Sequence, residues 1–146
     1  MEQSPFRLES LRALREHAEA CAKHALAEEL SVGAQRAEDL RLAEAAVEKA
    51  RHATSGDSAF SGSQLAAHDA FVARRERERL LAQQWAIAQE RRIAESRDAL
   101  AQASRARSAF ERLKEKHRAD QVAAANRREQ AELGEIALTR HLRAQS

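Results

Sequence analysis

The chain has 146 residues and a formal net charge of +2, and its composition is that of long helices rather than of a compact globule. Apolar residues make up 43% of it, but 34 of them are alanine, with only 15 Leu, 4 Phe, 1 Trp and no Tyr. So few large apolar side chains exclude a thick core. The low Gly and Pro content argues against sheets, and no run approaches the roughly 18 apolar residues of a membrane-spanning helix. The lone Cys21 cannot form an internal disulfide and fits a reducing cytoplasm.

The first predicted helix covers residues 5–53. Ser4 is a suitable N-cap, and Pro5 suits the first helical position because the N–H it lacks would have no partner there. Arg51 and His52 favour the C-terminal end, where cations interact well with the helix dipole. A turn over residues 54–63, which holds two of the four glycines, then interrupts the helical pattern.

The second predicted helix covers residues 64–141. Ser61 and Gln64 have the spacing of a capping box, and the isolated Gly134 is expected only to weaken the helix locally, by about 1 kcal/mol. Residues 1–64 carry a net charge of −3 and residues 65–146 a net charge of +5, which favours pairing of the two helices. We therefore expect an all-α protein whose residues 1–146 form one long antiparallel two-helix coiled coil, a helical hairpin with the second helix longer.

The apolar spacing supports this pairing. A 3-4 alternation in the first helix is followed by a seven-residue repeat on a shifted line, which predicts a change of register. The first line is Leu11, Leu14, Ala18, Cys21 and Ala25, and the second is Leu26, Gly33, Leu40 and Val47. In the second helix the predicted seam is Ile93, Ser96, Leu100, Ala103, Ala106 or Arg107, Phe110 and Leu113. The alternative, a bundle of three or four helices, needs further breaks that the sequence does not show.

Candidate chemical sites are few. His17, Cys21 and His24 share a helical face, but His17 and His24 would lie about 10 Å apart along the axis, too far for ordinary ligation of one metal ion. The sequence has no phosphate-binding glycine loop and no paired acid and base, so we expect no enzyme, no catalytic residue, no metal and no cofactor. Glutamates interrupt the arginine run over 74–79, which predicts a solvated face rather than a nucleic-acid site.

Four motifs resemble the FliJ family of flagellar export proteins. They are Phe6-Arg7-Leu8-Glu9-x-Leu11, Phe71 soon after the turn, Phe110-Glu111-Arg112-Leu113-Lys114-Glu115-Lys116-His117, and Glu129-Gln130-x-Glu132-Leu133-Gly134-Glu135-Ile136-Ala137. The last motif is the most diagnostic, and Gly134 stands where the family usually has Asp. The resemblance extends over nearly the whole chain.

This resemblance implies a non-enzymatic, stalk-like coiled coil of the flagellar type III export apparatus, and hence a role in flagellum biogenesis and motility. The implied partners are the hexameric flagellar export ATPase, whose assembly it would promote, and the cytoplasmic domain of the export-gate membrane protein. Some members of the family also escort export chaperones. The implied location is the cytoplasm, at the inner face of the inner membrane below the flagellum, with no membrane insertion and no nucleic acid.

The resemblance also implies site residues. Phe71 matches the aromatic position that the family uses toward the export gate. The family position one helical turn further on is usually apolar, but it is Arg75 here. The residues implied to bind the ATPase ring are Phe6, Leu8, Leu133, Ile136 and Leu138. The alternatives are that Phe71 packs in the seam between the helices, and that the apolar residues of the two termini pack against each other. Three other functions stay open at this point: a generic coiled-coil tether, an injectisome counterpart, and a basic helical nucleic-acid binder.

Overall fold

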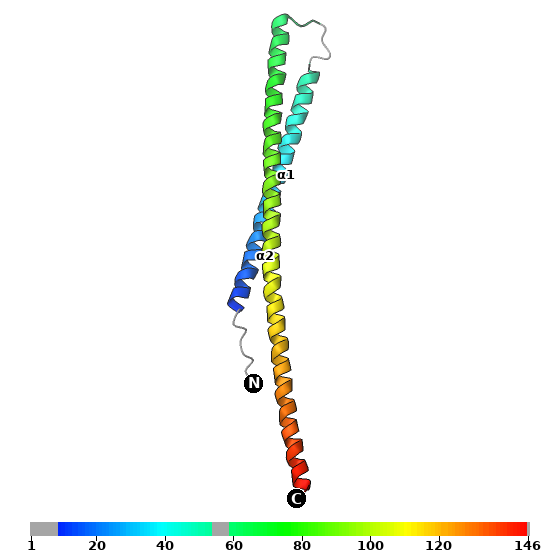
Figure 1. Ribbon diagram of the computed structural model, residues 1–146. Helices are drawn as coiled ribbons and strands as arrows, with labels where there is room; N and C mark the ends of the chain where they lie inside the picture. The colour runs from blue at the N-terminus through cyan, green and yellow to red at the C-terminus, as the bar shows by residue number, and fades with distance from the viewer. Residues whose placement is uncertain (1–8, 54–58, 146) are drawn as a thin grey trace. The chain divides into compact units, whose positions relative to one another are not determined.

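The protein folds into two helices. A computed structural model describes residues 9–53 and 59–145, so Phe6, Leu8 and the expected N-cap Ser4 lie outside the described residues. Helix α1 is Glu9–His52 and helix α2 is Gly62–Ala144, and the described part contains no strand (Figure 1). The prediction of an all-α protein with two packed helices, the second longer, is confirmed.

The start of α2 is fixed by the predicted capping box. The Gln64 backbone N–H donates to Ser61 Oγ over 3.3 Å, and the Ser61 backbone N–H donates to Gln64 Oε1 over 2.9 Å. These two bonds satisfy N–H groups that a helix N-terminus leaves without partners. The helix begins directly after Ser61 for this reason.

The contacts divide the chain into two units. Unit 1 combines Met1–Ala18 with Ala103–Ser146, and unit 2 is Glu19–Gln102. In each unit a stretch of α1 runs antiparallel to a stretch of α2 (Figure 1). In unit 2, for example, Glu29 contacts Gln89 whereas Arg51, later in α1, contacts the earlier Glu76 of α2.

Unit 2 has a regular seam in which positions alternate at spacings of three and four residues, the pattern of a left-handed coiled coil. Its members are buried or half-buried: Glu19, Ala22, Leu26, Glu29, Gly33, Arg36, Leu40, Ala43, Val47 and Ala50 of α1, and His68, Val72, Arg75, Arg79, Ala82, Ala86, Gln89, Ile93, Ser96 and Leu100 of α2. Small residues are frequent among them, so the two backbones approach closely. Gly33 is the extreme case, because a Cβ placed there would lie 2.7 Å from Ile93 Cδ1.

Two polar side chains of α2 join the helices within this seam. Gln89 is 5% exposed, and its amide Nε2 donates to the Glu29 backbone carbonyl over 3.0 Å and to the Glu29 carboxylate. His68 Nε2 donates to the carbonyl of Ala50 over 2.9 Å, which satisfies one of the last carbonyls of α1. A buried polar group with a partner across the seam favours one register over others, because any shift would leave it unsatisfied.

Unit 1 is joined mainly by charged side chains. Arg12 donates to the Glu111 carboxylate over 2.9 Å, and Lys114 Nζ lies 3.4 Å from the Glu9 carboxylate. The Arg15 guanidinium lies 5.9 Å from the centre of the Phe110 ring. The pKa of Glu9 is held below its usual value, chiefly by the hydrogen bond from Arg12.

The predicted change of register in α1 was wrong. The line of Leu11, Leu14, Ala18, Cys21 and Ala25 is exposed throughout, and a single seam continues from Val47 back to Glu19. The seam positions there are Ala22 and the acidic Glu19, which is 6% exposed and pairs with Lys23 over 3.2 Å. Because a charged residue takes a seam position, the apolar pattern indicated the neighbouring face instead. Leu113 of α2 was also misplaced, since it is exposed and Lys114 takes the adjacent seam position.

Candidate functional site

The C-terminal segment, which we define as residues 125–145 of unit 1, is the most exposed part of α2. Every side chain in it is exposed, and the Glu9 carboxylate at the start of α1 pairs with Lys114, which precedes the segment. The orange-to-red part of α2 accordingly has no stretch of α1 beside it (Figure 1). This segment is thus a helix without a helical partner among the described residues.

Large apolar side chains lie on opposite sides of the C-terminal segment. Leu133 is 59% and Ile136 50% exposed, and their spacing of three places them on one side. Leu138 and Leu142, four residues apart, are 61% and 57% exposed. Two residues turn a helix by about 200°, so Leu138 points away from Ile136. The structure therefore brings Leu133 and Ile136 together but separates Leu138 from them.

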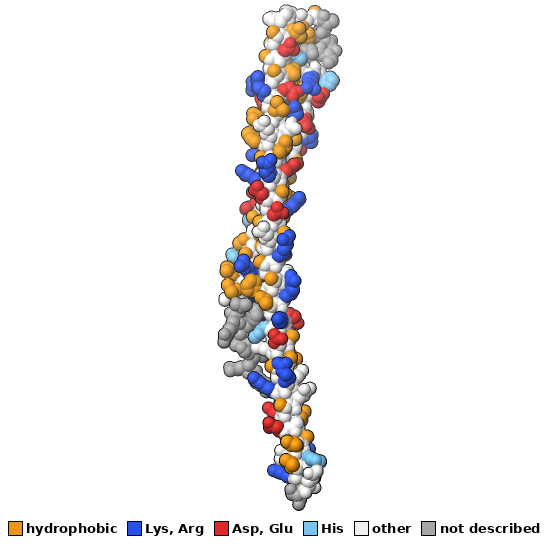
Figure 2. Space-filling view, in the orientation of Figure 1, with side chains coloured by type: hydrophobic (Ala, Val, Ile, Leu, Met, Phe, Trp, Pro, Cys, Tyr) orange, Lys and Arg blue, Asp and Glu red, His pale blue; other side chains and the backbone are white. Residues whose placement is uncertain are grey.

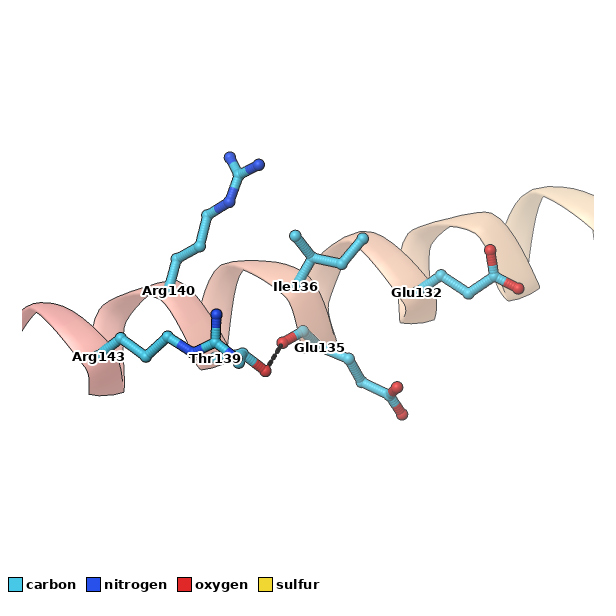
Figure 3. Close-up of a pocket in the computed structure, with 6 residues that line it drawn as sticks. All are labelled: Glu132, Glu135, Ile136, Thr139, Arg140 and Arg143. Carbon is cyan, nitrogen blue, oxygen red and sulfur yellow. Dashed lines mark hydrogen bonds between the residues drawn. The ribbon is translucent and has the colours of Figure 1, made fainter.

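Polar side chains surround Ile136. Glu132, Glu135, Thr139, Arg140 and Arg143 line the same open surface, with Ile136 and Arg140 on one side of the helix and Glu135 on the other (Figure 3). Thr139 Oγ1 donates to the Glu135 carbonyl over 2.8 Å. Helix α2 runs unbroken through Gly134, as predicted, and a Cβ at that position would meet no atom within 4 Å. The segment is an accessible helix face rather than a cavity.

Phe71 lies in the first turns of α2, in unit 2. Its side chain is 44% exposed, and it precedes the seam residue Val72. The Arg75 guanidinium lies 5.1 Å from the centre of its ring and also donates to Glu78 over 2.7 Å. A cation held over an aromatic face fixes the ring at the surface. Phe71 is therefore an exposed, ordered aromatic side chain outside the seam.

Potential metal-ligating side chains are dispersed along the described part of the chain. Among residues 9–53 and 59–145, no three His, Cys, Asp or Glu side chains are grouped to hold a metal ion, and His24 is placed 3.5 Å from Glu28. Within that same part of the chain, no helix is long and apolar enough to cross a membrane. The surface instead shows apolar side chains among charged ones in both units (Figure 2).

The sequence matches the flagellar FliJ protein family over residues 3–146. The chain belongs to this family. FliJ membership makes it a component of the flagellar protein export apparatus, a type III secretion system, as the motifs indicated. No curated protein and no solved structure matches the chain.

Sequence reasoning missed one exposed group. Leu80, Leu81, Trp85 and Ile87 of α2 are each about half exposed, in unit 2. The signal was present, because residues 80–88 contain no charged residue in a chain that is 33% charged. Only Ala82 and Ala86 of this stretch face the seam.

Proposed function

We propose that this FliJ family member is a stalk-like, non-enzymatic part of the flagellar export apparatus that binds the hexameric export ATPase, promotes its assembly and couples it to the export gate. It would act in the cytoplasm at the inner face of the inner membrane, and escort of export chaperones is a further expected task. The family match supports the assignment to the export apparatus. The exposed apolar side chains of α2 support the proposed contacts with the ATPase and the export gate.

The observation that carries the ATPase contact is the distribution of apolar side chains on the C-terminal segment. A partner on one side of the helix would cover Leu133 and Ile136 and leave Leu138 in water, or the reverse. A helix that is apolar on opposite sides is suited to being surrounded, because only then are all its apolar side chains buried. The central opening of a ring of subunits surrounds a helix in this way.

The test is hexamerisation and ATP hydrolysis of the export ATPase from the same organism, with and without this protein. We expect stimulation by the full chain and none by a chain ending after residue 128. The double variant I136A/L138A should lose most of the stimulation, because truncating apolar anchors in an interface typically weakens binding by tenfold or more. Leu14→Ala is the matched control, since Leu14 is 59% exposed but lies in α1.

Two outcomes would contradict this assignment. Equal stimulation by the full and the shortened chain would remove the C-terminal segment from the contact. Absence of both binding and stimulation would favour the alternative of a coiled-coil tether. Helix content, followed by circular dichroism, must be unchanged in I136A/L138A for the comparison to hold.

Phe71 is proposed as the anchor toward the cytoplasmic domain of the export-gate protein. Its ring is exposed and held outside the seam by Arg75, so Phe71→Ala should weaken gate binding by about tenfold without changing helix content. Phe60, 42% exposed and just before α2, provides a matched control as Phe60→Ala. Equal affinity of the two variants for the gate domain would remove Phe71 from the site.

A further inference from the structure

A second coiled-coil repeat lies on the side of α2 that faces away from α1 in unit 2. We call it the outer stripe, and its members are Arg77, Leu80, Gln84, Ile87 and Arg91. They follow the same alternation of three and four residues as the seam, and all five are exposed. At about 100° per residue, these positions lie some 150° around the helix from the seam. The stripe therefore presents a surface on which another helix can pack.

The apolar content of this surface is high for a solvent-facing helix. Leu80 is 47% exposed and Ile87 52%, and Leu81 at the border of the stripe is 49% exposed. Trp85, four residues after Leu81 on the same side of the helix, is 54% exposed, and the Arg36 guanidinium of α1 lies 5.0 Å from its ring centre. The largest side chains of this stretch are outside the seam, while the small Ala82 fills it. Burial of four half-exposed apolar side chains is a substantial driving force for association.

The charges at the ends of the outer stripe select the occupant. Arg77 and Arg91 are 14 residues apart, about 21 Å along the helix. Within the described part of the chain neither arginine forms a hydrogen bond or an ion pair. The acidic neighbours of Arg77 are already engaged, Glu76 by Arg79 and Arg51 and Glu78 by Arg75 and Arg74. At the other end, Glu95 lies four residues after Arg91 but forms no ion pair with it in the described residues, so both arginines are available to carboxylates of a partner.

A second copy of this chain fits the stripe poorly. If two stripes packed antiparallel, Arg77 of one copy would face Arg91 of the other, and if they packed parallel each arginine would face itself. Like charges brought together at an interface disfavour the pairing. A helix with carboxylates at both ends of an apolar stretch has the complementary charge.

We propose that the outer stripe binds an amphipathic helix of another protein, with apolar residues at spacings of three and four and acidic residues about 14 positions apart that pair with Arg77 and Arg91. This contact uses neither Phe71 nor the C-terminal segment, so it is independent of the proposed ATPase and gate contacts. It would make α2 the central helix of a three-helix assembly over this stretch.

Trp85 provides the readout, because it is the only Trp in a chain without Tyr. The probe is a synthetic four-heptad helical peptide without Trp or Tyr, with leucine at the seam positions and glutamates 14 residues apart; a second peptide has lysines in their place. We expect the glutamate peptide to shift the Trp85 emission to shorter wavelength and to bind at least tenfold more tightly than the lysine peptide in calorimetry, with a preference that weakens as salt is added.

Variants separate the apolar from the charged contribution. L80D/I87D should abolish binding of the glutamate peptide, whereas Leu42→Asp, at a 53% exposed position of α1 in the same unit, should leave it unchanged. R77E/R91E should reverse the preference toward the lysine peptide. Circular dichroism and stimulation of the export ATPase should be unaffected in L80D/I87D, so failure here is distinguishable from failure of the proposed function.

Two results would overturn the proposal. One is equal binding, or no binding, of the two peptides. The other is a shift of Trp85 emission that grows with protein concentration in the absence of peptide, together with a dimer mass in analytical ultracentrifugation. That second result would identify another copy of the chain as the occupant.

Discussion

Gly33 offers the sharpest test of the close approach between α1 and α2. A Cβ added there would lie 2.7 Å from Ile93 Cδ1, while the next atoms, Ile93 Cγ1 and Gln89 Cγ, would both lie 3.9 Å away, in ordinary contact. The obstruction is therefore one terminal methyl group. Gly33→Ala and Ile93→Val, which removes that methyl group, form a double-mutant cycle that isolates it.

The expected free energies follow from this geometry. Replacing Gly by Ala inside a helix stabilises it by about 1 kcal/mol. Carbon atoms pack at about 3.5–4.0 Å, so the new Cβ overlaps Ile93 Cδ1 by roughly 1 Å, and overpacking of this kind costs about 1–3 kcal/mol. Because this methyl group ends a half-exposed side chain that can move, we expect an overpacking cost at the low end of this range, about 1 kcal/mol. Gly33→Ala alone should thus be nearly neutral.

In the Ile93→Val background, Gly33→Ala should stabilise the protein by the full gain in helix propensity, about 1 kcal/mol. Ile93→Val alone costs about 0.5 kcal/mol, at the low end for a buried methyl group. The double variant should then exceed the sum of the single effects by about 1 kcal/mol, a Tm difference of roughly 3 °C for a chain of this size. Thermal unfolding followed by circular dichroism measures all four proteins. Strictly additive effects would refute the close approach of Gly33 to Ile93.

Two further predictions concern the polar contacts between the helices of unit 2. The pKa of Glu76 is lowered, chiefly by the hydrogen bond from Arg79 and also by attraction to Arg51 and Arg79, which outweigh the opposing effect of desolvation. The stability that ionised Glu76 contributes is therefore present above the ordinary carboxyl pKa and is lost as the pH falls below it. Tm should fall between about pH 5 and pH 3, and should fall less in Glu76→Gln; an identical acid response of the two proteins would count against this prediction. Gln89→Leu replaces a buried polar side chain, and with it the donor to the Glu29 carbonyl, by an apolar one, so the Tm should change little or rise. The single helix register should be lost, and additional oligomers should appear in sedimentation experiments. A monodisperse variant would show that Gln89 does not fix the register.

Composition and short-range spacing were sufficient to predict the secondary structure and the class of fold. Low Gly and Pro content predicted helices, and the single turn-rich interval predicted one break, since nothing else in the chain opposes a helix. The capping box at Ser61 and Gln64 was legible because it depends only on residues three apart, whose side chains satisfy each other's backbone N–H groups. Seam positions such as Ile93 and Phe110 were predicted from spacing for the same reason.

Spacing correctly placed Leu26, Gly33, Leu40 and Val47 in the seam, but it did not show that the earlier part of α1 packs through the same line. Alanine is frequent on several faces of α1, and the true seam includes Glu19, Glu29 and Gly33, so apolar spacing could not distinguish it from the exposed line that begins at Leu11. Close packing of small residues, and hydrogen bonds such as that from Gln89 to the Glu29 carbonyl, select the seam, and they exist only once both helices are in place. The same selection leaves Leu80, Trp85 and Ile87 in solvent, because the small Ala82 and Ala86 take the seam positions of this stretch.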